Sequence, residues 1–349
     1  MTARRIPARD LDEILEHTAN VWRELDGASV LLTGVTGFVG TWLLEALAHA
    51  RLHTGYRTGA VVHVRSIEHF RERVPHLAAA DWITTIVGDI REFRRPPVPV
   101  DFVIHAASTV SANAHSANPL GTQDLVVRGT QRVLHTAVEC QATRVLLVSS
   151  GSVYGRNERA GIGLSESSHS GIDPFQSGRL IAESKRAAEA AGAATAAHSP
   201  LDVVIGRGFA MSGPWLPLTS TFALGNFVRD ALAGIDIQLT GDGTPVRSYL
   251  YGGDVATWLW TLLLRGGHSE VFNVGSEEAI SIADLAQLVA GRAGQRVVSV
   301  PEARGPSAVD YFVPDTTRAR ALGLQSRISI STAVDRMLDW YREVDDPEI

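Results

Sequence analysis

Apolar positions near the N-terminus recur with helical spacing. The residues at this spacing are Leu11, Ile14, Leu15, Thr18, Trp22 and Leu25. Residues three and four positions apart share one helical face, so the pattern predicts an amphipathic helix from Leu11 to Leu25. Asp10 is a candidate for its N-cap, and Gly27 is a candidate for its end. We expect this helix to pack on the main domain.

From residue 29 onwards, short apolar runs alternate with longer amphipathic stretches. The predicted strands are Ser29–Thr33, Ala60–Val64, Trp82–Val87, Asp101–His105, Arg144–Ser149 and Asp202–Ile205. Helical patterns such as Val39–Ala50 and Gln123–Cys140 separate most of them. This alternation predicts an α/β fold with a parallel sheet covered on both faces, and strands of such a sheet are apolar throughout.

The regular alternation loosens after residue 207. Segments 212–220 and 301–314 are rich in proline, glycine and serine, as loops are. We therefore expect two domains. The larger comprises 1–206 and is re-entered at about 235–265, through a strand at 235–239 and a helix at 255–264. The smaller comprises 207–234 and 266–349.

Composition narrows the class of protein. The chain has 349 residues, 45% hydrophobic and 20% charged, which is a globular composition. Its net charge of −6 argues against nucleic acid as the main partner. The single cysteine, Cys140, excludes a disulfide scaffold and fits a reducing cytoplasm. Apolar runs stay short of the roughly 18 residues of a membrane span, and no signal peptide is evident, so we expect a cytoplasmic protein without a membrane partner.

A glycine-rich turn joins the first predicted strand to its helix. Its glycines are Gly34, Gly37 and Gly40. Glycines allow a tight turn and close backbone approach to a pyrophosphate, which the free N–H groups at the helix start then bind. Because the turn follows a strand and precedes a helix, it predicts dinucleotide binding, with a purely structural turn as the alternative.

The segment Thr33–Gly40 resembles the fingerprint of the extended short-chain dehydrogenase/reductases, which include nucleotide-sugar epimerases, dehydratases and 4-ketoreductases. Further segments that resemble this family follow in order along nearly the whole chain: Gly88–Ile90, His105–Ser108, Val148–Gly155, Gly241–Tyr251 and Phe272–Gly275. The resemblance implies a Rossmann-type doubly wound parallel sheet with a smaller C-terminal α/β substrate domain. It also implies a nucleotide-diphosphate sugar as substrate and a homodimer formed through helices 121–140 and 180–197.

The resemblance also implies where ligands bind. The cofactor-binding residues would be Gly34, Thr36, Gly37, Phe38, Val39, Gly40, Arg65, Asp89, Ile90, Ala106, Ala107, Ser108, Lys185 and Phe209. The substrate-binding residues would be Ser150, Ser152, Asn226, Arg247 and Arg318. Arg247 would hold the nucleotide phosphates, or alternatively pair with a nearby acid, and Arg318 would add a second basic contact.

The end of the second predicted strand bears on the choice of cofactor. NAD binders usually carry an acidic residue there, which accepts hydrogen bonds from the ribose. This chain has Arg65 and Ser66 instead, with no carboxylate before Glu68. A guanidinium can pair with the 2′-phosphate of NADP, stack on adenine, or simply be solvated. We expect NADP or NAD, with NADP slightly favoured.

The catalytic helix departs from the family pattern. In the family, a Tyr-x-x-x-Lys pair on one helical face performs acid/base chemistry at the nicotinamide. Here the lysine is Lys185, but the tyrosine position holds Ile181, and no tyrosine lies between Tyr154 and Tyr249. Losing a general acid/base costs about 10²–10⁴-fold in rate. Either another group supplies the proton, or the chemistry needs no tyrosine, or the chain is not a catalyst.

Ser150 and Lys185 are the catalytic candidates. Ser150 matches the family Ser/Thr that bonds the reacting sugar oxygen, although a hydroxyl at a strand end can also simply bond backbone. Gly151 and Ser152 stand where 4,6-dehydratases carry an Asp-Glu pair, so a standard dehydration is not expected. Glu166 and Asp173 are expected in the exposed loop before the catalytic helix.

Other residues have simpler explanations. His49 and His53 are four apart, but no third ligand accompanies them, so no metal site is predicted. His105 is expected to be structural, and His169 is placed where it could reach a substrate. Trp258 and Trp260 are expected to pack in the core.

Two functions are consistent with these features. The first is an NAD(P)-dependent enzyme, an epimerase or a 4-ketoreductase, that transfers hydride at carbon 4 of a nucleotide-diphosphate hexose. The second is a non-catalytic dinucleotide-binding sensor or subunit, which the missing tyrosine favours. The sequence leaves the nucleotide and the sugar open.

Overall fold

Seven parallel strands form the central sheet in the order β10-β6-β5-β4-β1-β2-β3. The computed structural model describes residues 4–108, 118–157, 159–168, 180–218, 222–300 and 310–343. The strands of this sheet are β1 Ser29–Thr33, β2 Gly59–Val64, β3 Ile83–Val87, β4 Phe102–His105, β5 Arg144–Ser150, β6 Asp202–Gly208 and β10 Val271–Val274. The predicted α/β fold of the Rossmann type is confirmed, and the six predicted strands agree with β1 to β6 to within three residues.

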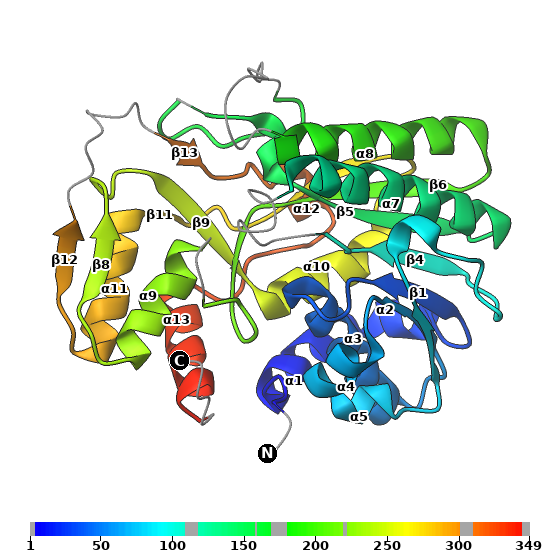
Figure 1. Cartoon of the computed structure of the whole chain (residues 1–349), viewed down its shortest axis with the longest axis horizontal. Helices are drawn as coiled ribbons and strands as arrows, with labels where there is room; N and C mark the ends of the chain where they lie inside the picture. The colour runs from blue at the N-terminus through cyan, green and yellow to red at the C-terminus, as the bar shows by residue number, and fades with distance from the viewer. Residues whose placement is uncertain are drawn as a thin grey trace.

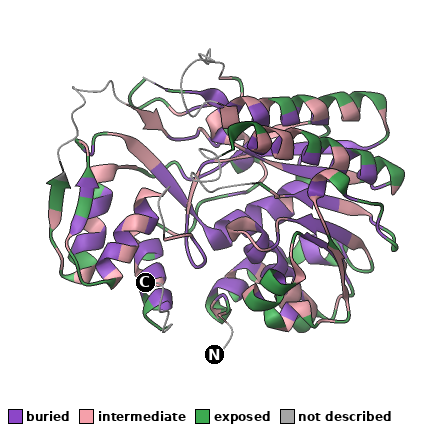
Figure 2. Ribbon diagram, in the orientation of Figure 1, coloured by how far each residue is buried: buried purple, intermediate pink, exposed green. Residues whose placement is uncertain are grey.

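Helices cover both faces of this sheet (Figure 1). One face carries α3, Phe38–Thr54, and α10, Gly252–Arg265, and the other carries α7, Pro119–Glu139, and α8, Leu180–His198. Alternate residues of a strand point to opposite faces, so Leu146 packs with the first pair while Val145 and Leu147 pack against α7. In Figure 2 the strands are largely buried and the outward helical faces are exposed.

The smaller part of the chain is built around β9, Val246–Tyr251. The strands β7 Ala210–Ser212, β11 Ala279–Ser281 and β13 Tyr311–Phe312 all pair with it. Beside them lie β8 Ile237–Thr240 with β12 Val297–Val300, and the helices α9 Ala223–Leu232, α11 Ile282–Ala293 and α13 Ile330–Arg342. The short helix α12, Thr317–Ala321, contacts β10 of the central sheet instead. The remaining short helices are α4 Ile67–Arg73, α5 Pro75–Ala78, η1 Ile90–Glu92 and η2 Gly151–Tyr154.

The strand assignments differ from the expected domain division in two places. The strand expected at 235–239 does not enter the central sheet, because β8 pairs with β12. By contrast β10, which we expected in the smaller domain, extends the central sheet beside β6. Strands of four residues carry no mark of their partner, since pairing depends on contacts distant in sequence. The helix expected at 255–264 lies within α10 and packs on α3, as predicted.

The N-terminal segment forms two short helices rather than one. These are α1, Ala8–His17, and α2, Ala19–Glu24, separated at Thr18 where φ is −123°. Asp10 is not a cap, because the N-cap is Pro7 and Asp10 lies inside α1 with its side chain fully buried. It accepts a hydrogen bond from the Tyr251 hydroxyl (2.7 Å) and pairs with Arg336 (2.5 Å).

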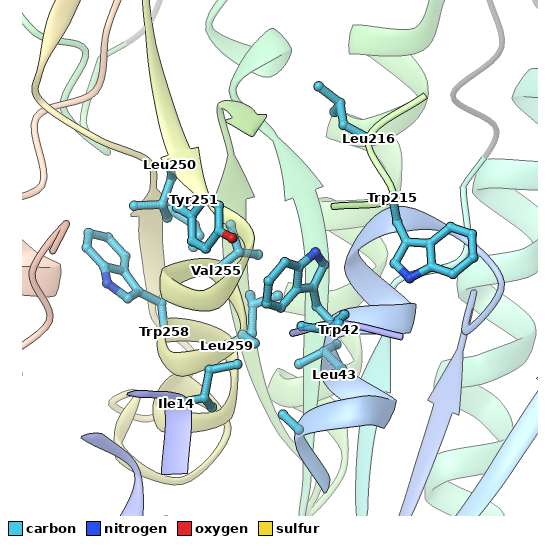
Figure 3. Close-up of a cluster of buried hydrophobic side chains, with 14 of the residues drawn as sticks. Ile14, Trp42, Leu43, Trp215, Leu216, Leu250, Tyr251, Val255, Trp258 and Leu259 are labelled. Carbon is cyan, nitrogen blue, oxygen red and sulfur yellow. The ribbon is translucent and has the colours of Figure 1, made fainter. Parts of the chain in front are cut away.

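Tryptophans anchor the core between α3, α10 and the N-terminal helices. The side chains of Trp42 and Tyr251 lie close together (Figure 3), with their ring centroids 5.5 Å apart. The Trp42 Nε1 donates to the Pro214 carbonyl. Trp258 and Trp260 are buried as expected, and Trp260 lies 5.0 Å from Trp22. In the described part of the chain, no helix is both long and apolar enough to cross a membrane.

Candidate active site

The glycine-rich turn lies where the strand order of the sheet reverses. Strand β1 has β4 on one side and β2 on the other, so the loops after β1 and β4 leave the sheet in different directions. Gly34 follows β1 with φ +76°, and a Cβ there would lie 2.7 Å from the Ala106 carbonyl group and the Ala107 nitrogen. A Cβ on Gly40 would lie 2.1 Å from the Gly34 oxygen. Backbone therefore packs directly on backbone at this point, which is where doubly wound sheets bind ligands.

The start of α3 provides free backbone donors beside this turn. Gly37 is the N-cap and offers no side-chain cap, so the first N–H groups of the helix, on Phe38, Val39 and Gly40, have no acceptor within it. The dipole of this 17-residue helix adds partial positive charge at the same end. A turn without side chains next to free donors fits a dinucleotide pyrophosphate. Thr36 is half-buried within the same turn.

The segment after β4 is fixed by a chain of hydrogen bonds. The Ala107 N–H donates to Thr33 Oγ1 (3.1 Å), which lies 2.8 Å from His105 Nδ1. His105 Nε2 lies 3.2 Å from Thr130 Oγ1, and burial lowers the pKa of His105 to about 3. His105 is therefore neutral and structural, as expected. It holds Ala106 and Ala107 against the glycine turn, while Ser108 is exposed.

Two turns at the far side of the expected cofactor site differ in exposure. Arg65 is exposed at the end of β2, just before Ser66 caps α4 by accepting from the His69 N–H. Asp89 is held by Arg91, whose hydrogen bonds lower the pKa of that carboxyl to about 2. Ile90 is buried in the core against α7. The Arg65 side chain is therefore accessible to a ligand, whereas the Ile90 side chain packs in the core.

Both catalytic candidates are found near the carboxyl end of β5. Ser150 ends the strand, and its Oγ accepts a hydrogen bond from the Ser152 N–H (3.1 Å), so its own hydrogen stays available to a ligand. Lys185 reaches the same strand from α8, where its Nζ donates to the Val148 carbonyl oxygen (3.0 Å). Burial lowers the pKa of the Lys185 ammonium to about 8, against the opposing effect of the Glu189 carboxylate. Ile181 is half-buried one helical turn earlier.

A charged network that the sequence did not reveal lies behind this strand end. Glu189 accepts hydrogen bonds from Ser149 Oγ (2.5 Å) and from Arg207 on β6. The Arg207 guanidinium carbon lies 4.8 Å from the centre of the Tyr154 ring. The Tyr154 hydroxyl donates to Asn273 Oδ1 (2.7 Å), and burial raises the pKa of Tyr154 to about 12. These contacts join residues at least 18 positions apart, so no local pattern in the sequence indicates them.

Glu166 occupies a position that we predicted wrongly. It is half-buried rather than exposed, and its Oε1 accepts a hydrogen bond from the Asn273 N–H (2.8 Å). Asn273 also donates to the carbonyls of Leu164 and Asp315, so it ties three segments together. The loop is held because β10 joins the sheet beside β6. Asp173 and His169 lie outside the described residues.

Aromatic rings face the positions where dehydratases carry acids. A Cβ on Gly151 would lie 2.8 Å from Phe312 and 3.0 Å from Phe209. The rings of Phe209 and Phe312 are 4.7 Å apart, and Phe209 is buried. The Ser152 hydroxyl is buried with no hydrogen-bond partner among the described residues. The site therefore has an apolar wall here with one unsatisfied hydroxyl.

The remaining substrate candidates are engaged within the chain. Arg247 pairs with Asp310 (2.7 Å), the alternative considered from the sequence, and its guanidinium lies 5.8 Å from the Phe312 ring. Arg247 is thus near the apolar wall. Arg318 pairs with Glu270 (2.9 Å), which precedes β10 and so lies at the opposite end of the sheet from the glycine turn. Asn226 accepts a hydrogen bond from Arg229 on α9.

The histidine pair has a local partner. His49 Nε2 lies 2.7 Å from Asp12 Oδ1, and the rings of His49 and His53 are 4.1 Å apart. Within the described ranges, no group of three or more histidine, cysteine or acidic side chains is placed to hold a metal.

Comparison with known proteins adds a family and a set of related structures. The model of the NAD dependent epimerase/dehydratase family matches residues 30–275, a span that runs from β1 to β10. UDP-glucuronic acid decarboxylase 1 of Xenopus tropicalis is 25% identical over 327 residues, covering 92% of this chain and 73% of the relative. UDP-glucuronic acid decarboxylase 2 of Arabidopsis thaliana is 27% identical over 333 residues, covering 91% and 69%.

Solved structures share the fold over almost their whole length. A dTDP-glucose 4,6-dehydratase from Streptomyces venezuelae with NAD bound gives a TM-score of 0.78 at 24% identity, over 90% of this chain and 97% of that chain. A UDP-glucose 4-epimerase from Thermotoga maritima with UDP-glucose gives 0.74 at 20% identity, over 90% and 99%.

Proposed function

We propose that this chain, which belongs to the NAD dependent epimerase/dehydratase family, transfers hydride at carbon 4 of a nucleotide-diphosphate hexose as an epimerase or a 4-ketoreductase. The observation that carries the proposal is that Ser150 ends β5 and that Lys185 bonds the Val148 carbonyl two residues earlier, two strands from the glycine turn after β1. A cofactor site and a pair of polar groups thus share one edge of the sheet.

The cofactor site is formed mainly by backbone. The turn from Gly34 to Gly40 and the free N–H groups of α3 would bind the pyrophosphate, while Ala106 and Ala107 would line the site. When bound, the nicotinamide supplies or accepts the hydride. NAD is bound in related structures, which supports a nicotinamide cofactor here. The exposed Arg65 favours NADP slightly.

The substrate side favours redox at carbon 4 over elimination of water. Positions 151 and 152 hold glycine and serine, so no acid/base pair stands there, and Gly151 lies against the rings of Phe209 and Phe312. Arg247 would exchange its partner Asp310 for a phosphate of the nucleotide, because guanidinium binds either anion in the same geometry. Ser150 would donate its free hydrogen to the reacting sugar oxygen.

A second candidate is a cofactor-binding subunit without catalysis. The aliphatic side chain of Ile181, one turn before Lys185, supports it, because a phenol at that position would supply the proton. Against it stands the buried lysine beside Ser150, since a sensor needs no polar pair at the hydride end of the site.

Turnover decides between these candidates. Purified protein is incubated with NAD(H) or NADP(H) and a panel of UDP- and dTDP-hexoses and their 4-keto forms, and products are separated by chromatography. We expect conversion of at least one sugar, and a loss on the order of 10²-fold in Ser150→Ala. Cofactor binding without conversion of any sugar would support the subunit instead.

The same family implies a homodimer, which we also propose. Helices α7 and α8 pack side by side on one face of the sheet (Figure 1). On α7, the side chains of Leu120 and Val138 are 71% and 38% exposed. Sedimentation at micromolar concentration is expected to give twice the mass of 37.5 kDa, and a monomer would contradict the proposal.

A further inference from the structure

The chain contains one lysine, Lys185, among its 32 lysines and arginines. The other 31 cationic side chains are arginines, whose guanidinium group stays protonated in proteins. The lysine amine differs from a guanidinium because it can lose its proton when its surroundings disfavour charge. Among the lysine and arginine positions, only Lys185 therefore carries a readily removable proton.

The geometry directs the amine toward the reacting end of the site. Lys185 is only 9% exposed, and its Nζ donates one hydrogen to the Val148 carbonyl oxygen at 3.0 Å. Val148 lies two residues before Ser150, the last residue of β5, so the amine is held at the carboxyl end of this strand. An ammonium has three donors, so the contact with Val148 leaves others for a ligand.

The other ionisable groups around this strand end are committed elsewhere. Tyr154 of η2 donates to Asn273, and burial raises its pKa to about 12. His105 of β4 bonds threonines through both ring nitrogens and stays neutral. Glu189 of α8 accepts from Ser149 and pairs with Arg207 of β6. Glu166 holds the backbone of Asn273.

We propose that Lys185 itself carries the proton of the reaction, in the place of the phenol that Ile181 lacks. This inference rests on the proposed function. In reduction, the hydride from the reduced nicotinamide adds to the carbonyl carbon of the 4-keto sugar, and the carbonyl oxygen takes a proton from the Lys185 ammonium. The products are the alcohol, the oxidised cofactor and a neutral amine, which regains its proton from water. Oxidation of the alcohol runs through the same atoms in reverse.

The surroundings allow both forms of the amine to exist near neutral pH. Burial disfavours the ammonium and brings the pKa of Lys185 to about 8, while the carboxylate of Glu189 opposes this. Arg207 already neutralises that carboxylate, which limits its effect on Lys185. A general acid works best when its pKa is close to the working pH. An arginine at position 185 could hold a ligand but could not exchange a proton.

The single lysine makes a direct titration feasible. Protein grown with ¹³C-labelled lysine gives NMR signals from Lys185 alone, and the variant Arg23→Lys adds one exposed lysine as an internal reference. We expect Lys185 to titrate near 8 and the reference lysine to titrate at the usual lysine pKa of about 10.4. If Lys185 titrates with the reference lysine, the inference is overturned while the proposed function stands.

Kinetics of two variants separate proton transfer from positioning. Lys185→Arg keeps the charge, so NADH titration should show binding within about threefold of wild type, with turnover reduced on the order of 10²-fold or more. Lys185→Met should weaken NADH binding and also reduce turnover. In the wild type, reduction should decline above the pH at which Lys185 titrates. Turnover by Lys185→Arg within tenfold of wild type would overturn the inference, and absence of any turnover by the wild type would overturn the proposed function with it.

Discussion

Glu189 of α8 and Arg207 of β6 form a two-point ion pair behind the end of β5, with Oε2 2.7 Å from Nη2 and Oε1 3.0 Å from Nε. Their side chains are only 11% and 15% exposed. Two charges withdrawn from water in this way depend on one another, because either one alone would be buried without a counter-charge.

Replacing Glu189 should therefore destabilise the fold. Glu189→Gln keeps the shape of the side chain but leaves Arg207 uncompensated, at a cost of about 3 kcal/mol in the free energy of unfolding. The matched control on the same helix is Glu183→Gln, whose carboxylate is 41% exposed and lies 3.6 Å from Arg186. It should cost about 0.5 kcal/mol or less. Urea denaturation measures both, and equal costs would show that burial of the pair is unimportant.

The glycine turn can be tested with two glycines of similar backbone conformation. Gly34 and Gly27 have φ of +76° and +78°, but a Cβ would meet backbone only at Gly34. Gly27→Ala should cost about 1–2 kcal/mol from backbone strain alone. Gly34→Ala should cost more and abolish NADH binding, because the turn must separate from Ala106. Thermal unfolding and fluorescence titration give the two readouts, and normal NADH binding by Gly34→Ala would contradict the assigned site.

Cofactor preference is predicted to depend on Arg65. Arg65→Glu replaces a charge that can pair with the 2′-phosphate of NADP by one that repels it, so the ratio of KM for NADPH over NADH should rise about tenfold or more. The control is Arg71→Glu, an exposed arginine on α4, which should leave the ratio unchanged. An unchanged ratio in both variants would exclude Arg65 as a phosphate ligand.

Restoring the phenol should increase simple redox turnover. Ile181→Tyr places an acidic hydroxyl one helical turn before Lys185, where it can take over proton transfer at carbon 4. The larger ring is expected to cost about 1–3 kcal/mol in stability through overpacking. We would measure kcat for 4-ketoreduction together with NADH affinity. Normal NADH binding with loss of the native reaction would mean that the site serves different chemistry.

The buried amine should also make stability depend on pH. The pKa of Lys185 is about 8 in the folded protein and about 10.4 when unfolded. Between these values the unfolded chain binds the extra proton, so the free energy of unfolding rises with pH, by up to about 3 kcal/mol. Lys185→Met removes this contribution. We would measure the free energy of unfolding of both proteins by denaturation from pH 7 to 10.5. The value for the wild type minus the value for Lys185→Met should increase with pH, and a constant difference would contradict the lowered pKa.

The central sheet of the protein follows from the amino-acid pattern alone. Runs such as Ser29–Thr33 and Arg144–Ser149 are apolar on both faces, and only strands covered by helices on both sides satisfy that pattern. The glycine-rich first turn likewise needed no tertiary information, because three glycines between a strand and a helix already predict dinucleotide binding there. Both features depend on residues close together in the sequence, so the sequence pattern was sufficient to predict them.

Which side chains come together around the site depends on how distant segments of the chain pack. The sequences of the short strands β8 and β10 do not indicate which strands they pair with. Asp10 has the sequence position of a helix cap, but in the fold it bonds Tyr251 and Arg336 instead. The pair of Glu189 with Arg207 and the approach of Lys185 to Val148 join residues 18 and 37 positions apart. Burial and distance set the charge of such groups, and both depend on how the helices pack on the sheet rather than on the order of residues.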